Sequence, residues 1–141
     1  MTGGTGTSPR GSRIDERLAA ARAQLDRVAP EQLADEVAAG AVLIDLRPEA
    51  DRLAEGELPG AIVVERIHLE WRLDPTSGHA LPEAGDDVRV ILFCNEGYAS
   101  SLAAADLQAL GITRATDLDG GYRGWRATVD ADRPHLPIAA V

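Results

Sequence analysis

The chain has 141 residues, a length typical of one domain, and its 45% hydrophobic and 26% charged residues are those of a globular protein with a core. Fourteen basic and 23 acidic residues give a net charge of −9, which disfavours partners such as nucleic acid or an anionic membrane. All fourteen basic residues are arginines, so a Walker A loop and a Schiff-base lysine are excluded. The single cysteine, Cys94, excludes an internal disulfide, and three scattered histidines without ligand spacing predict no metal.

The first part of the chain divides into a tail and a helix. Residues 1–13 are rich in Gly, Thr and Ser and lack the apolar core of a secretory signal, so we interpret them as a disordered tail. Apolar residues from Ile14 to Val28 recur at the spacing of an amphipathic helix, which we assign to residues 14–29. This helix could pack on the domain or mediate a homodimer. With no apolar run near the ~20 residues that span a bilayer, we expect a cytoplasmic protein whose lone thiol stays reduced.

Residues 30–141 alternate between predicted strands and predicted helices. The apolar runs 41–46 and 88–93 are typical of strands covered on both faces, as in a parallel sheet. This alternation predicts an α/β domain with a central, mostly parallel sheet flanked by helices. The remaining predicted elements are two shorter strands at 61–64 and 115–118 and helices at 30–39, 48–55, 67–73, 100–110 and 121–129.

Cys94 stands at the carboxyl end of the strand 88–93, the end at which ligands bind in open parallel sheets. A short loop follows it, and a helix then begins near Ser100. Loop N–H groups and a helix N-terminus directed at the sulfur would stabilise a thiolate, and Gly97 permits the unusual backbone angles of a tight loop. The alternative is a buried, inert thiol, which is the more frequent fate of a cysteine that ends an apolar strand.

Four segments of the chain resemble motifs of the rhodanese (sulfurtransferase) family. Residues 43–47 (Leu-Ile-Asp-Leu-Arg) resemble its first strand motif, and residues 56–61 (Gly-Glu-Leu-Pro-Gly-Ala) resemble its Gly-His-Ile-Pro-Gly-Ala turn. Residues 94–100 resemble its active loop, with Gly three positions and Ser six positions after the cysteine. Residues 120–125 resemble its closing Gly-Gly-x-x-x-Trp motif. The four occur in the family's order over most of the chain.

The resemblance implies a rhodanese-like three-layer domain over residues 30–141. It implies that Cys94 takes a sulfane sulfur from a small donor, thiosulfate or a persulfide, and passes it to a thiol or another thiophilic acceptor. The resemblance implies no cofactor. Loop amides can hold an anionic persulfide, so no general base is needed either. The alternative function is a low-turnover sulfur carrier or protein-binding module. The loop residues expected at the substrate are Asn95, Glu96, Gly97, Tyr98, Ala99, Ser100 and Ser101.

The loop departs from the family pattern in its charge. Many family members carry an arginine five residues after the cysteine, whereas this chain has Ala99 there and adds a negative charge at Glu96. We therefore expect a weak local attraction for a dianion such as thiosulfate, unless Arg66 or Arg72 enters the site from elsewhere.

Two further interpretations follow from residue positions. Asp45 and Arg47 end a predicted strand, and such a pair more often orders the neighbouring loop than it takes part in catalysis, so we assign them to structural support. A phosphatase of the related Cys-x5-Arg type would need an arginine at Ser100, so that function is not expected.

Overall fold

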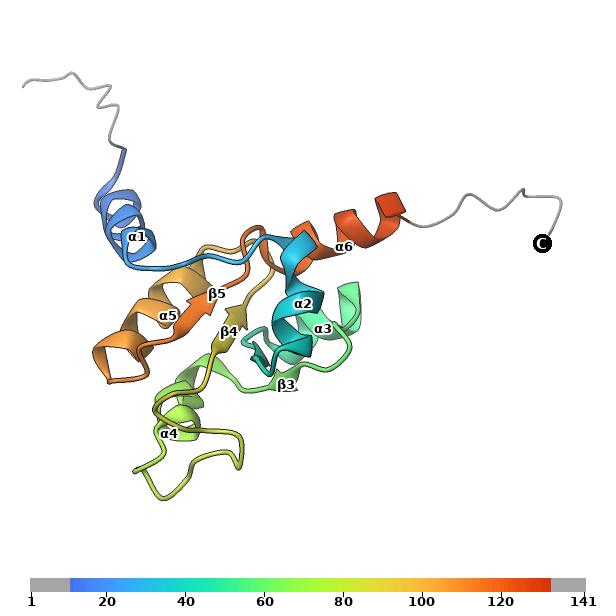
Figure 1. The fold of residues 1–141 in the computed structure, drawn as a ribbon. Coiled ribbons are helices and arrows are strands. Elements are labelled where there is room, and N and C mark those ends of the chain that lie inside the picture. Colours follow the sequence, from blue (N-terminus) through green and yellow to red (C-terminus); the bar gives the residue numbers. More distant parts are fainter. Residues whose placement is uncertain (1–10, 133–141) are drawn as a thin grey trace, which may run out of the picture.

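The computed structural model describes residues 11–132, and every statement below on the structure refers to this part of the chain. Its strands are β2 (Val42–Asp45), β3 (Ile62–Val63), β4 (Val90–Phe93) and β5 (Ala115–Asp117). Its helices are α1 (Arg13–Ala23), α2 (Leu33–Ala38), α3 (Glu49–Glu55), α4 (Leu69–Leu73), α5 (Ala99–Ala109) and α6 (Gly121–Asp132), with 3-10 turns η1 (Pro30–Gln32) and η2 (Arg66–His68) (Figure 1).

The four strands form one parallel sheet in the order β3-β2-β4-β5. This confirms the predicted α/β fold with a parallel central sheet. β4 is paired on both sides, by β2 and β5, so the strand that leads to Cys94 is interior to the sheet. Because the strands are parallel, Asp45, Cys94 and Asp117 come together at the carboxyl edge.

Side chains that alternate along the strands build two cores, one on each face of the sheet. One core joins Ile44, Val90 and Leu92 to residues of α4 and α5. The other joins Leu43 and Phe93 to residues of α2 and α6. Figure 1 shows the same division, with α4 and α5 on one side of the sheet and α2 and α6 on the other. The layers are therefore helix, sheet and helix.

The N-terminal helix is shorter than the sequence predicts. α1 begins with a capping box, in which the Ser12 hydroxyl accepts from the Asp15 amide and the Asp15 carboxylate accepts from the Ser12 amide. It ends at Ala23, whereas the apolar spacing predicts a helix as far as Val28. Val28 instead forms a parallel bridge with Leu118, in which its N–H donates to the Asp117 carbonyl, its carbonyl accepts from the Asp119 N–H, and its side chain is buried.

α1 packs against α5 of its own chain, and its role in a homodimer stays a prediction. Residues 1–10 of the predicted tail lie outside the described part, and Arg13 already belongs to the helix. Within residues 11–132 no helix has both the length and the apolar character needed to cross a membrane. In the same range, no three His, Cys, Asp or Glu side chains gather as a metal site would require.

Asp45 and Arg47 form an ion pair that is almost completely buried, with each side chain 1% exposed. Oδ2 of Asp45 lies 2.9 Å from Nη2 of Arg47. The Arg47 guanidinium also lies 4.1 Å from the centre of the Tyr122 ring and donates to the Gly56 carbonyl. Because both charges have lost their water, each depends on the other remaining in place.

We expect Asp45→Asn to lower the free energy of unfolding by about 3–5 kcal/mol, since it leaves the buried Arg47 charge without its partner. Asp26→Asn is the matched control, because Asp26 is 89% exposed in its ion pair with Arg89 and should contribute less than about 1 kcal/mol. Urea denaturation of both variants measures the difference. Equal losses would contradict the importance of the buried pair.

Candidate functional site

Cys94 lies partly exposed in the loop between β4 and α5. Its Sγ accepts hydrogen bonds from the backbone N–H of Gly97 at 3.3 Å and from that of Ser100 at 3.4 Å. The sulfur is therefore not sealed in the core, which was the alternative for a cysteine at this position. It faces a loop whose amides donate toward it.

The N-terminus of α5 reinforces this arrangement. The helix begins at Ala99, and the residue before it, Tyr98, makes no side-chain cap. Uncapped N–H groups and the helix dipole both favour a negative charge at this end of a helix. The Ser100 amide donates to Sγ, so the sulfur occupies the place of a capping acceptor at this helix end.

The closing glycine pair approaches the loop backbone to backbone. The Tyr122 amide donates to the Cys94 carbonyl at 2.8 Å, and the Arg123 amide donates to the Asn95 carbonyl at 3.0 Å. A Cβ on Gly121, where φ is +62°, would lie 2.5 Å from the Cys94 carbonyl oxygen. This close approach is the physical reason for glycine at the start of α6.

Asp117 holds the inner side of the loop and the start of α5. It is fully buried, and its Oδ2 accepts from the hydroxyls of Ser100 and Ser101, each at 2.7 Å. Arg27 binds the same carboxylate through Nε at 2.8 Å and Nη2 at 3.1 Å. Burial opposes the Arg27 charge, but the hydrogen bond and charge of Asp117, with smaller contributions from Asp119 and Cys94, leave the pKa of Arg27 raised.

A second network ties the beginning of the loop to α3 and α6. Asn95 accepts from Arg47 at 3.3 Å and donates to the Glu55 carboxylate at 3.1 Å. Arg123 makes two hydrogen bonds to the same carboxylate, and these hold the pKa of Glu55 below its ordinary value. Arg123 also lies 3.2 Å from Glu96, so the acidic loop residue has a cationic neighbour.

The predicted external cations bind elsewhere. Arg66 pairs with Glu70 and Asp106, and Arg72 donates to the His79 carbonyl. The guanidinium groups that reach the loop belong to four other residues: Arg22 and Arg27, which donate to the Gly97 carbonyl, Arg47, which donates to the Asn95 side chain, and Arg123 beside Glu96.

Sequence reasoning missed Arg22 and Arg27 for an identifiable reason. Arg22 and Arg27 precede every motif that the resemblance uses, and the longer predicted helix gave no cause to direct Arg27 at the sheet. Asp117 was accessible to prediction, because an acidic residue that ends a buried strand beside the strand of Cys94 falls at the carboxyl edge.

We expect Gly121→Ala to destabilise the protein by about 2–4 kcal/mol, because it combines a left-handed backbone with a clash against the Cys94 carbonyl. Gly60→Ala isolates the backbone contribution, since φ is +86° there and no described atom lies within 4 Å of the added Cβ. The control should lose only about 1–2 kcal/mol in urea denaturation. If both variants lose the same free energy of unfolding, the close approach of Gly121 to the loop does not contribute to stability.

Comparison with known sequences agrees with the geometry. The model of the family described as "Rhodanese-like domain" matches residues 29–128. Thiosulfate sulfurtransferase GlpE of Stutzerimonas stutzeri is 34% identical over 113 residues, which cover 77% of this chain and 92% of that protein. GlpE of Ectopseudomonas mendocina is 31% identical over 110 residues with the same coverage.

Solved structures extend the agreement to the fold. A Rhodopseudomonas palustris protein of unknown function, described as a possible tyrosine phosphatase, is 28% identical and covers 95% of this chain and 100% of its own, with a TM-score of 0.74. The human single-domain sulfurtransferase TSTD1 is 26% identical and covers 72% of this chain and 95% of its own, with a TM-score of 0.61. With the Cys94 loop at the carboxyl edge of a parallel sheet and the family match over residues 29–128, this chain belongs to the rhodanese-like domain family.

Proposed function

We propose that this rhodanese-like domain is a sulfurtransferase that carries sulfane sulfur as a persulfide on Cys94. The observation that carries the proposal is the partly exposed Cys94 Sγ, which accepts two loop N–H groups at the N-terminus of α5. The names of the GlpE relatives and of the human structural neighbour support the same activity.

In the first half of the reaction, the Cys94 thiolate attacks the outer sulfur of the donor. A new S–S bond forms to Cys94, and the donor's own bond to that sulfur breaks. The electron pair leaves with the rest of the donor, as sulfite from thiosulfate or as a thiolate from an organic persulfide. The enzyme is left with a Cys94 persulfide and no net redox change.

In the second half, a thiophilic acceptor such as a thiolate attacks the outer sulfur of the Cys94 persulfide. The bond between the two sulfurs breaks, and its electron pair returns to Cys94 as the thiolate. The amides of the loop hold negative charge on sulfur throughout, so neither step needs a general base. Gly97 and Ser100 already donate to Sγ and are placed to serve the outer sulfur.

The charge of the loop favours sulfur donors that carry little negative charge. Glu96 is more than half exposed at the loop, and Ala99 stands where many family members carry arginine. We therefore place thiosulfate, a dianion, below monoanionic or neutral persulfides as a donor. A reducing compartment such as the cytoplasm would keep the Cys94 thiol and a thiol acceptor available.

Phosphate-ester hydrolysis is not supported by the loop. A phosphatase of the Cys-x5-Arg type grips phosphate with a bidentate arginine at the sixth position after the cysteine. Here that position is Ser100, whose hydroxyl is committed to Asp117.

The test of the function is intact-protein mass spectrometry after exposure to thiosulfate and to glutathione persulfide. Wild type should gain the mass of one sulfur atom, and a thiol acceptor should remove it. Cys94→Ser should gain nothing and should stay folded, because serine is nearly the same size but forms no persulfide. Sulfur uptake by Cys94→Ser at the wild-type rate would exclude Cys94 as the carrier.

A second prediction concerns Ala99, which stands where many family members carry an arginine. Ala99→Arg should lower the KM for thiosulfate by about one to two orders of magnitude, the effect of a charge-assisted hydrogen bond, and should change the KM for a neutral donor much less. Ala99→Gln, a neutral side chain of similar reach, is the control. Steady-state kinetics at matched ionic strength measure both donors. Equal effects of Arg and Gln, or of Ala99→Arg on both donors, would contradict the role of charge.

A further inference from the structure

Two side-chain donors converge on one backbone oxygen of the loop, the Gly97 carbonyl. Arg22 donates through Nη2 at 2.7 Å and Arg27 through Nη2 at 3.0 Å. Two guanidinium groups on one carbonyl are more than backbone satisfaction requires, because a single partner would meet that need. The carbonyl is therefore fixed in one direction.

The direction of this carbonyl determines the direction of an amide. The Gly97 carbonyl and the Tyr98 N–H belong to the same planar trans peptide, so they point to opposite sides. The neighbouring amides of Gly97 and Ser100 donate to Cys94 Sγ. Because the Gly97 carbonyl is held toward the two guanidinium groups, the Tyr98 N–H of the same peptide is directed to the opposite side of the loop, where the sulfur lies.

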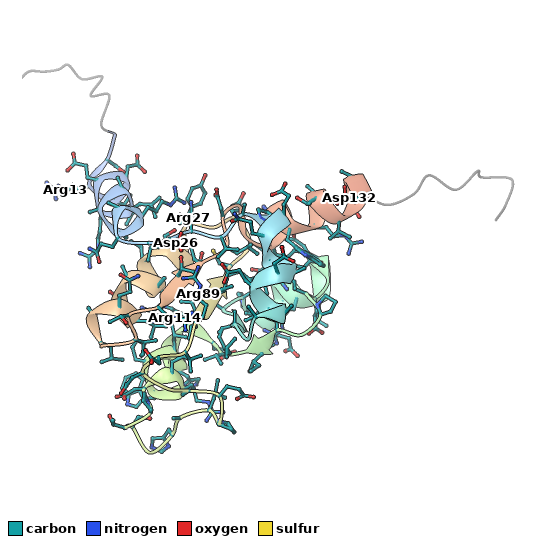
Figure 2. All side chains as sticks on the ribbon, viewed as in Figure 1. Arg13, Asp26, Arg27, Arg89, Arg114 and Asp132 are labelled. Atoms are coloured by element: carbon teal, nitrogen blue, oxygen red, sulfur yellow. The ribbon has the colours of Figure 1, made fainter. Side chains whose placement is uncertain are left out.

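Arg22 reaches the loop in two more ways. Its Nε donates to the Ser101 hydroxyl at 3.1 Å, and its guanidinium lies 5.4 Å from the centre of the Tyr98 ring. Arg22 therefore contacts both residues that this peptide joins, Gly97 through its carbonyl and Tyr98 through its ring. It lies in the last turn of α1, and Arg27 follows in the segment that leads to the sheet, where Figure 2 labels it.

Both arginines precede residue 29, where the match to the family model begins. We propose that Arg22 and Arg27 are positioning residues for sulfur transfer: the segment before the family domain holds the Gly97 carbonyl so that the Tyr98 N–H faces the sulfur on Cys94. The proposal rests on the proposed function, which supplies the sulfur on Cys94.

Arg22 is the residue to test, because Arg27 also balances the buried Asp117. Arg22→Gln removes the charged donor, Arg22→Lys keeps a cation, and Arg17→Gln removes one charge from the same helix as the matched control. Two readouts apply: the rate of Cys94 alkylation by iodoacetamide against pH, and kcat and KM with glutathione persulfide. Urea denaturation checks that each variant is folded.

We expect Arg22→Gln to move the alkylation profile to higher pH and to lower kcat about tenfold, with KM changed less than about twofold. Arg22→Lys should recover most of both, and Arg17→Gln should match wild type. Wild-type behaviour of Arg22→Gln, or equal effects of Arg22→Gln and Arg17→Gln, would overturn the proposal. If Arg22→Gln fails to fold, Arg22→Lys decides: wild-type kinetics support a positioning cation, and kinetics reduced tenfold in a folded protein overturn it.

Alkylation does not require sulfur transfer, so the two proposals fail separately. If wild type forms no persulfide with any donor, the sulfurtransferase proposal fails. The effect of Arg22→Gln on alkylation would still support the role of Arg22 in directing the loop amide.

Discussion

The site depends on one buried carboxylate, Asp117. It lies at the end of β5 with no exposed surface, and it holds two hydroxyls from the first turn of α5 and the guanidinium of Arg27. A buried charge of this kind is stable only when its hydrogen bonds are complete, so the three partners and the carboxylate fix one another. Because Ser100 and Ser101 directly follow the cysteine loop, the position of the loop is set from the adjacent strand.

The charges around the loop are mostly neutralised where they stand. Arg27 faces Asp117, Arg123 faces Glu55 and Glu96, and Arg47 faces Asp45. The attraction for an anionic sulfur therefore comes chiefly from oriented backbone N–H groups at the N-terminus of α5. Such dipoles act over a short distance and suit a single charged sulfur atom better than a diffuse dianion. An acidic chain can in this way host an anionic intermediate.

Local chemistry made much of this architecture predictable. Two apolar runs identified β2 and β4, and the resemblance to rhodanese motifs identified the Cys94 loop and the Gly120-Gly121 motif, whose contact with the loop only the structure shows. The end of α1 was not predictable from apolar spacing, because Val28 is apolar in a helix and in a sheet alike and tertiary pairing with Leu118 decides between them. The contacts of Arg22 and Arg27 with Gly97 join residues about 70 positions apart, and long-range pairs of this kind leave no local pattern.

The same pairing of Val28 with Leu118 closes one side of the sheet. β5 has three residues, and the bridge to Val28 takes up backbone groups beside its end; β3, at the other side, has only two residues. Unpaired strand edges are templates for association and aggregation, and short or covered edges prevent it. A domain that presents Cys94 at the carboxyl edge of its sheet thus offers little backbone to another copy. Together with a net charge of −9, this favours a protein that remains dispersed at high concentration.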